Sequence, residues 1–248
     1  DAPASSSRKQ EGGIWGLIFG AGTSSSKGKK DTDEAGTDGG GVTGYNKNAN
    51  DMAFSPTEKR PDQTVDMSVV RSLSGIPKSD YSPQHQANTG AMENWVYPSE
   101  QQYFNAMKRK GYNPPEKDIG AILAIHNSVN ERGWEQVLEW ESFRGAKAPK
   151  LKKFEGRPKD LSPKAKLLTM LGVDAPFDRH DWVVERDGGK EVRYVIDFYH
   201  VPNKPGLPVH MDVRPALDSP SAVLDRIEMQ FRKTFIPDSL RQEEKGRR

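Results

Sequence analysis

The chain has 248 residues, no cysteine, and a net charge of +2 from 37 basic and 35 acidic side chains. The absence of cysteine excludes structural disulfides, cysteine-ligated zinc and a cysteine nucleophile. The nearly balanced charge gives no electrostatic case for binding nucleic acid.

The first quarter of the chain has the composition of a disordered segment. Of the 23 glycines in the whole chain, 11 lie between Gly12 and Gly44, among serine runs and alternating charges. We therefore expect residues 1–66 to be a disordered low-complexity segment, 67–237 to form one domain, and 238–248 to be a charged tail. The apolar run Ile14–Phe19 is too short to span a bilayer. It either docks on a membrane surface or a partner, or is a sticky patch in a disordered tail.

Helical patterning begins after an extended strap over residues 69–78. Ser99 and Gln102 have the spacing of a capping box, which predicts a helix that starts there and ends at Gly111. Asn113 with Glu116 predicts the cap of the next helix.

That next helix contains a second capping signal. Ser128 and Glu131 have capping-box spacing, and Gly133 weakens the middle of the segment. We therefore expect two helices that meet at a bend beside His126, and such a bend exposes the imidazole.

The second half of the chain turns to strands. Residues 146–159 are basic and loop-like, and Ser162-Pro163 predicts the start of a short helix. A hairpin is indicated where Asp187-Gly188-Gly189 separates two alternating segments. A further strand over 207–214 and an amphipathic helix from Ser219-Pro220 complete the domain. The predicted class is α+β, with helices packed against a small antiparallel β-meander.

His126 is the candidate ligand. At helical spacing it shares a face with Ile119, Ile122 and Leu123. A neutral imidazole on an apolar surface suits a flat, hydrophobic cofactor such as haem, whose iron histidine ligates well. The alternative is a packed histidine that hydrogen-bonds to backbone.

Five blocks of sequence resemble one family, the mitochondrial holocytochrome c synthases, also called cytochrome c haem lyases. His126–Glu131, followed by Trp134 and Leu138–Glu141, is similar to the family's haem-binding segment. The other blocks occur in the same order: Ser74–Lys78, Asn94–Glu100, Pro176–Trp182, and Val192–Tyr199 with Asp212–Ser219. The similarity runs from about Val69 to Arg232.

The resemblance implies an enzyme that attaches haem b, its substrate, to the CxxCH segment of apocytochrome c or c1. It implies that His126 is the iron ligand and the catalytic residue, and that the partner's histidine is the second axial ligand. Two partner thiols then add to the haem vinyl groups. Relatives often carry Cys-Pro pairs near the N-terminus, and this chain departs from that pattern.

The family also implies a location in the mitochondrial intermembrane space, peripheral on the inner membrane. Two other functions fit the residues. One is a non-enzymatic carrier that passes haem on intact. The other is a docking module for an unfolded partner, with His126 in the core.

The remaining candidates for haem contact each have a structural alternative. Asn127, Asn130 and Glu131 either orient the haem site or cap helices. An aromatic block either stacks on the porphyrin or packs in the core; it comprises Trp95, Tyr97 and Pro98.

Two arginines, Arg193 and Arg214, either bind haem propionates or belong to a lattice of salt bridges. The segment Asp178–Trp182 suggests acid–base groups, but pairing among its own charges is the favoured interpretation. We assign no role to His85, His200 or His210.

Overall fold

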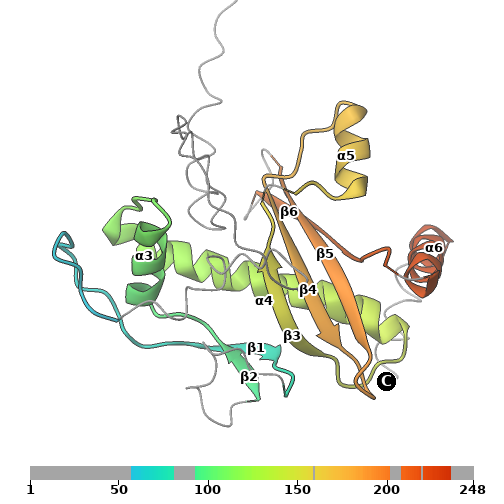
Figure 1. The fold of residues 1–248 in the computed structure, drawn as a ribbon, viewed down its shortest axis with the longest axis horizontal. Coiled ribbons are helices and arrows are strands. Elements are labelled where there is room, and N and C mark those ends of the chain that lie inside the picture. Colours follow the sequence, from blue (N-terminus) through green and yellow to red (C-terminus); the bar gives the residue numbers. More distant parts are fainter. Residues whose placement is uncertain (1–56, 81–92, 159, 202–207, 219, 236–248) are drawn as a thin grey trace, which may run out of the picture.

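The computed structural model describes residues 57–80, 93–158, 160–201, 208–218 and 220–235. Over these residues the fold is α+β, with four α-helices and two antiparallel sheets (Figure 1). The predicted fold class is therefore confirmed. The predictions for residues 1–56 and for the tail over 238–248 lie outside the described residues.

The first part of the domain is a two-stranded ribbon followed by a helix. Strands β1 (Leu73–Pro77) and β2 (Asn94–Val96) pair antiparallel and lead into α3 (Glu100–Arg109). The Ser99 hydroxyl accepts a hydrogen bond from the Gln102 amide, and the Gln102 side chain accepts one from Ser99 N–H. This capping box was predicted, as was the stop at Gly111, which has φ of +86°.

The ordered chain starts earlier than residue 67. Gln63 is only 6% exposed, and its side-chain amide exchanges two hydrogen bonds with that of Gln101 on α3, at 2.9 and 2.7 Å. The Thr64 backbone N–H donates to Glu116 at 2.8 Å. Paired amides thus hold Gln63, which precedes the expected boundary at residue 66, against α3.

Helix α4 (Ile119–Phe143) is a single element of 25 residues that follows the short 3₁₀ turn η2 (Glu116–Asp118). The predicted bend beside His126 is wrong. The Ser128 hydroxyl donates to the Ala124 carbonyl at 2.9 Å, a bond that a serine makes inside a continuous helix. Asn113 does not cap the helix either, because its side chain accepts a hydrogen bond from Lys108 at 2.8 Å.

The main sheet is an antiparallel meander in the order β3-β4-β5-β6. Its strands are β3 (Lys150–Gly156), β4 (Asp178–Glu185), β5 (Glu191–His200) and β6 (Val209–Pro215). The predicted hairpin joins β4 to β5, with Gly188 and Gly189 at positive φ. The loop predicted over 146–159 is wrong, because buried Leu151 pairs β3 with Val184 of β4.

Two helices attach to the β5–β6 side of this sheet. Helix α5 (Pro163–Met170) begins at the predicted N-cap, where the Ser162 hydroxyl accepts from the Ala165 amide. Helix α6 (Pro220–Phe235) follows β6, and the Arg226 guanidinium donates to the Pro215 carbonyl at 2.7 Å. Within the described ranges, no helix combines the length and the apolarity that crossing a bilayer requires.

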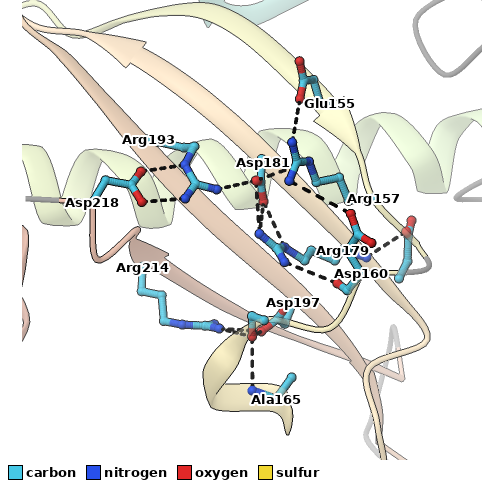
Figure 2. A network of polar contacts seen from close by, with 12 residues as sticks. Glu155, Arg157, Asp160, Ala165, Arg179, Asp181, Arg193, Asp197, Arg214 and Asp218 are labelled. Carbon is cyan, nitrogen blue, oxygen red and sulfur yellow. Dashed lines mark hydrogen bonds and ion pairs between the residues drawn. The ribbon is translucent and has the colours of Figure 1, made fainter. Parts of the chain in front are cut away.

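Strand alternation gives the sheet two different faces. One face carries Trp182, Ile196 and Phe198 and packs against α4. The other face carries charged side chains, joined in the network of Figure 2, where α4 runs behind the sheet.

A buried carboxylate fixes the end of α4 to the β4–β5 hairpin. Glu141 is fully buried and accepts hydrogen bonds from Arg186, at 2.5 and 2.9 Å, and from the Tyr194 hydroxyl at 2.5 Å. Burial raises the pKa of Tyr194 well above its ordinary value, so the phenol remains a donor. The helix therefore cannot slide along the sheet without separating a buried ion pair.

We predict that Glu141→Ala lowers the free energy of unfolding by about 3–5 kcal/mol, because Arg186 is left without its buried partner. The exposed Glu135 lies on the same helix. As a control, Glu135→Ala should change stability by less than about 0.5 kcal/mol. Urea denaturation of both variants measures the difference, and equal stabilities would contradict the role of Glu141.

Candidate functional site

His126 lies on α4 between two tyrosines. Its ring centroid is 5.5 Å from that of Tyr103 on α3 and 6.3 Å from that of Tyr97, which follows β2. The imidazole is thus partly buried at the junction of α3, α4 and the β1–β2 ribbon, rather than exposed at a bend. Sequence reasoning missed Tyr103 as a neighbour of His126; this tyrosine is buried on α3.

The environment keeps the His126 imidazole neutral. Burial lowers its pKa from 6.5 to about 4, the charges of His180 and Lys110 act in the same direction, and the hydrogen bond with Asn127 opposes them. At neutral pH the ring is therefore in the form that ligates a metal.

Two asparagines orient this ring. The Asn127 side-chain oxygen lies 3.1 Å from His126 Nδ1. An amide oxygen only accepts, so Nδ1 carries the hydrogen and Nε2 keeps its lone pair. The Asn130 amide donates to the His126 carbonyl at 2.8 Å and lies 3.5 Å from Nε2. Both predicted residues are thus brought together with His126, and neither caps a helix.

Glu131 forms a clasp between α4 and the β1–β2 ribbon. One carboxylate oxygen accepts from the Ser74 hydroxyl at 2.6 Å, the Gly75 N–H at 3.0 Å and the Tyr97 hydroxyl at 2.9 Å. A Cβ at Gly75 would stand 2.8 Å from the other oxygen, so the approach requires glycine. Burial raises the pKa of Tyr97 well above its ordinary value, which keeps its hydroxyl a donor.

The remainder of the predicted aromatic block is part of the core. Trp95 is buried, its indole N–H donates to the Leu151 carbonyl at 3.0 Å, and its ring meets Phe154 edge-on at 5.2 Å. Pro98 is also buried. Of the three residues, only Tyr97 is in ring contact with His126.

Arg193 and Arg214 lie on the charged face of the sheet, opposite α4 (Figure 2). Arg193 donates to Asp181 and Asp218, at 2.5 to 2.7 Å. Arg214 donates to Asp197 at 2.5 Å. The structure therefore does not bring these arginines together with His126. Both belong to a lattice of salt bridges, the second of the two interpretations given above.

The segment at the start of β4 divides between the two faces. Arg179 and Asp181 pair on the charged face, as the favoured interpretation predicted. His180 is in register with Ile196 on the side facing α4, and its Nε2 lies 3.2 Å from a buried Asp178 oxygen. Strand alternation from the core position Trp182 could have placed His180 on this side.

The described residues contain no cluster of three or more potential metal-ligating His, Cys, Asp or Glu side chains.

Comparison with known proteins assigns the chain to a family. The family described as cytochrome c/c1 heme lyase matches residues 23–146 and 143–230. The chain belongs to this family. No solved structure gives a statistically significant match to this chain.

Named members of the haem lyase family align over most of the domain. A putative holocytochrome-c1 synthase of Schizosaccharomyces pombe is 48% identical over 151 residues, covering 59% of this chain and 68% of its own. The human holocytochrome c-type synthase is 42% identical over 181 residues, which are 69% and 63% of the two chains. The holocytochrome-c synthase of Saccharomyces cerevisiae is 40% identical over 205 residues, 72% and 73% of the chains. The alignment with the human protein thus spans less than two thirds of that relative.

We predict that His126 in the haem-free protein titrates near pH 4 instead of 6.5. A histidine with a lowered pKa binds fewer protons in the folded state, so its contribution to stability is complete above pH 6.5 and is lost as pH falls toward 4. Proton NMR of the imidazole measures the pKa. A pKa at or above 6.5 would contradict the buried environment.

We predict that Gly75→Ala disrupts the Glu131 clasp, because the new methyl group would overlap the carboxylate. The loss of partly buried hydrogen bonds should lower the unfolding free energy by about 1 kcal/mol. Glu131→Gln should lose less, since an amide oxygen still accepts. If Gly75→Ala has the same urea midpoint of unfolding as the wild type, the clasp contributes nothing to the free energy of unfolding.

Proposed function

We propose that this chain is a holocytochrome c-type synthase that attaches haem b to the CxxCH cysteines of apocytochrome c or c1 through thioether bonds, with His126 as the axial iron ligand. The observation that carries the proposal is a neutral, oriented imidazole in a chain of the haem lyase family. Relatives named as synthases of holocytochrome c and c1 both support the substrate class.

The reaction is addition of each partner thiol across one haem vinyl group. The sulfur forms a bond to one vinyl carbon, the thiol hydrogen goes to the other, and the carbon–carbon double bond becomes single. No electrons are gained or lost, and no atom leaves. The work asked of the protein is positioning, because two fixed vinyls facing two thiols react far faster than free partners.

Each residue around His126 has a part in that positioning. Asn127 holds the hydrogen on Nδ1 and so leaves the Nε2 lone pair as the ligand. Asn130 ties its side chain to the His126 carbonyl one turn away. Tyr97 and Tyr103 restrict the ring on two sides, and the Glu131 clasp holds the ribbon that carries Tyr97.

The proposal includes a cellular setting. The partner's own CxxCH histidine supplies the second axial ligand, and ferrous iron requires an outside reductant. The protein works in the mitochondrial intermembrane space, bound peripherally to the inner membrane, where apocytochromes c and c1 receive haem.

The function is tested by incubating the haem-loaded protein with reduced apocytochrome c and, separately, apocytochrome c1. This chain has no cysteine, so every thioether formed is on the partner. We expect partner haem to survive denaturation and extraction with acid–acetone. Partners with cysteine-to-alanine changes should bind haem but not complete both bonds.

The matched variant is His126→Ala, which should keep the wild-type far-UV spectrum, because the ring is only partly buried, and should bind little haem by absorbance. Full haem occupancy of this variant would show that His126 is not the haem ligand. Haem that moves to intact apocytochrome but always extracts with acid–acetone would identify a carrier and refute the synthase.

A further inference from the structure

The two arginines predicted to bind haem propionates are on the wrong side of the sheet. Arg193 and Arg214 lie on the charged face, opposite α4, and are paired there with aspartates (Figure 2). Haem carries two carboxylates, and moving a carboxylate out of water is costly unless a cation accompanies it. We therefore expect a haem site at His126 to contain another positive group, within reach of the edge of the macrocycle.

The end of helix α3 brings such a group to the site. Helix α3 lies beside the N-terminal half of α4 (Figure 1). Tyr103 and Met107 on α3 are fully buried, and the ring centroid of Tyr103 is 5.5 Å from that of His126. Lys110 is the C-cap of this helix, with φ of −78°. Positions 103, 107 and 110 are spaced by four and three residues, so Lys110 continues the helix face that contacts His126.

The distance along α3 suits a contact at the edge of a haem. At the rise of an α-helix, Lys110 stands about 10 Å from Tyr103 along the helix axis. A lysine has a flexible four-carbon stem, and the haem propionates project from the edge of the porphyrin, away from the iron. Lys110 is half-buried, so solvent screens its ammonium less than that of an exposed lysine. Its charge already reaches the imidazole, since it is one of the groups that lower the pKa of His126.

Position distinguishes Lys110 from two other basic residues nearby. Lys108 points to another side of α3, where its ammonium donates to the Asn113 side chain at 2.8 Å. His180 also affects the candidate ligand through its charge, but its Nε2 lies 3.2 Å from a buried Asp178 oxygen. A propionate beside His180 would meet this second carboxylate, and two like charges so close repel each other. Lys110 is therefore the favoured cation.

We propose that Lys110 binds a haem propionate and so fixes the rotation of the haem about its bond to His126. An iron–imidazole bond alone lets the macrocycle turn, whereas a charged contact at the edge selects one orientation. That orientation decides which vinyl group faces which partner thiol. The inference rests on haem binding at His126, which is part of the proposed function. It holds equally for a synthase and for a carrier, so it can fail separately from thioether formation.

The test compares haem with haem dimethyl ester, whose esterified propionates carry no charge. Both compounds are titrated into the full chain in the same dilute detergent solution, and the Soret absorbance gives the dissociation constants. The wild type should bind haem more tightly than the ester. Lys110→Gln should raise the dissociation constant of haem about tenfold, because a contact between two charges is lost, and should change that of the ester by less than about twofold. Lys110→Arg, which keeps the charge, should bind haem like the wild type.

The matched control is Lys117→Gln, which removes an equal charge from an exposed lysine on η2. It should bind both compounds like the wild type. The Soret maximum of haem bound to Lys110→Gln should match that of the wild type, because His126 still ligates the iron. Far-UV circular dichroism checks that all variants fold.

Three results would overturn the proposal. The first is a wild type that binds haem and its ester equally, or binds neither. The second is a Lys110→Gln variant that prefers haem as strongly as the wild type does. The third is a Lys110→Gln variant that loses affinity for both compounds equally, which would indicate a structural role. A wild type that prefers haem through Lys110 but forms no thioether would refute the synthase and leave this inference standing.

Discussion

The constraint on which the rest of the structure depends is that α4 is one rigid helix that contacts every layer. Near its middle, Glu131 binds the β1–β2 ribbon. Towards its end, the Trp140 indole donates to the Val213 carbonyl of β6 at 2.9 Å, and Glu141 binds the β4–β5 hairpin. A helix fixed by polar contacts in several turns has no freedom to rotate or slide. The direction in which His126 points is therefore set by residues far from it in sequence.

This arrangement explains why the polar residues of the His126–Glu131 block act differently although they lie within two turns. Asn127 and Asn130 face the imidazole and bond to it or to its backbone. Glu131 turns to the ribbon and fixes Tyr97, which in turn contacts the imidazole. The block thus combines the ligand, the groups that orient it, and the link that places a neighbouring wall. The Glu131 side chain affects the site through Tyr97, without itself contacting His126.

Local signals in the sequence predicted the elements whose causes are local. The Ser99 capping box, the Ser162 N-cap and the hairpin at Gly188-Gly189 each depend on residues within a few positions, and all are present. The bend predicted beside His126 was wrong because Glu131 uses its carboxylate for a tertiary contact instead of the expected cap. Strand β3 was missed because its sequence is rich in lysine and has one buried residue, Leu151, so it lacks the alternation of apolar and polar residues. The pairing of Leu151 depends on β4. The direction of the α6 apolar face could not be read from spacing, since periodicity shows that a helix has two faces and not which one packs.

The division of the sheet into two faces places the candidate site and helix α5 on opposite sides of the sheet. Helix α4 and His126 belong to the apolar face, whereas α5 is anchored on the charged face through Asp197 and Arg214. That charged network is internally paired, with Asp181 held by Arg179 and Arg193, so it separates the two sides without needing an outside ligand.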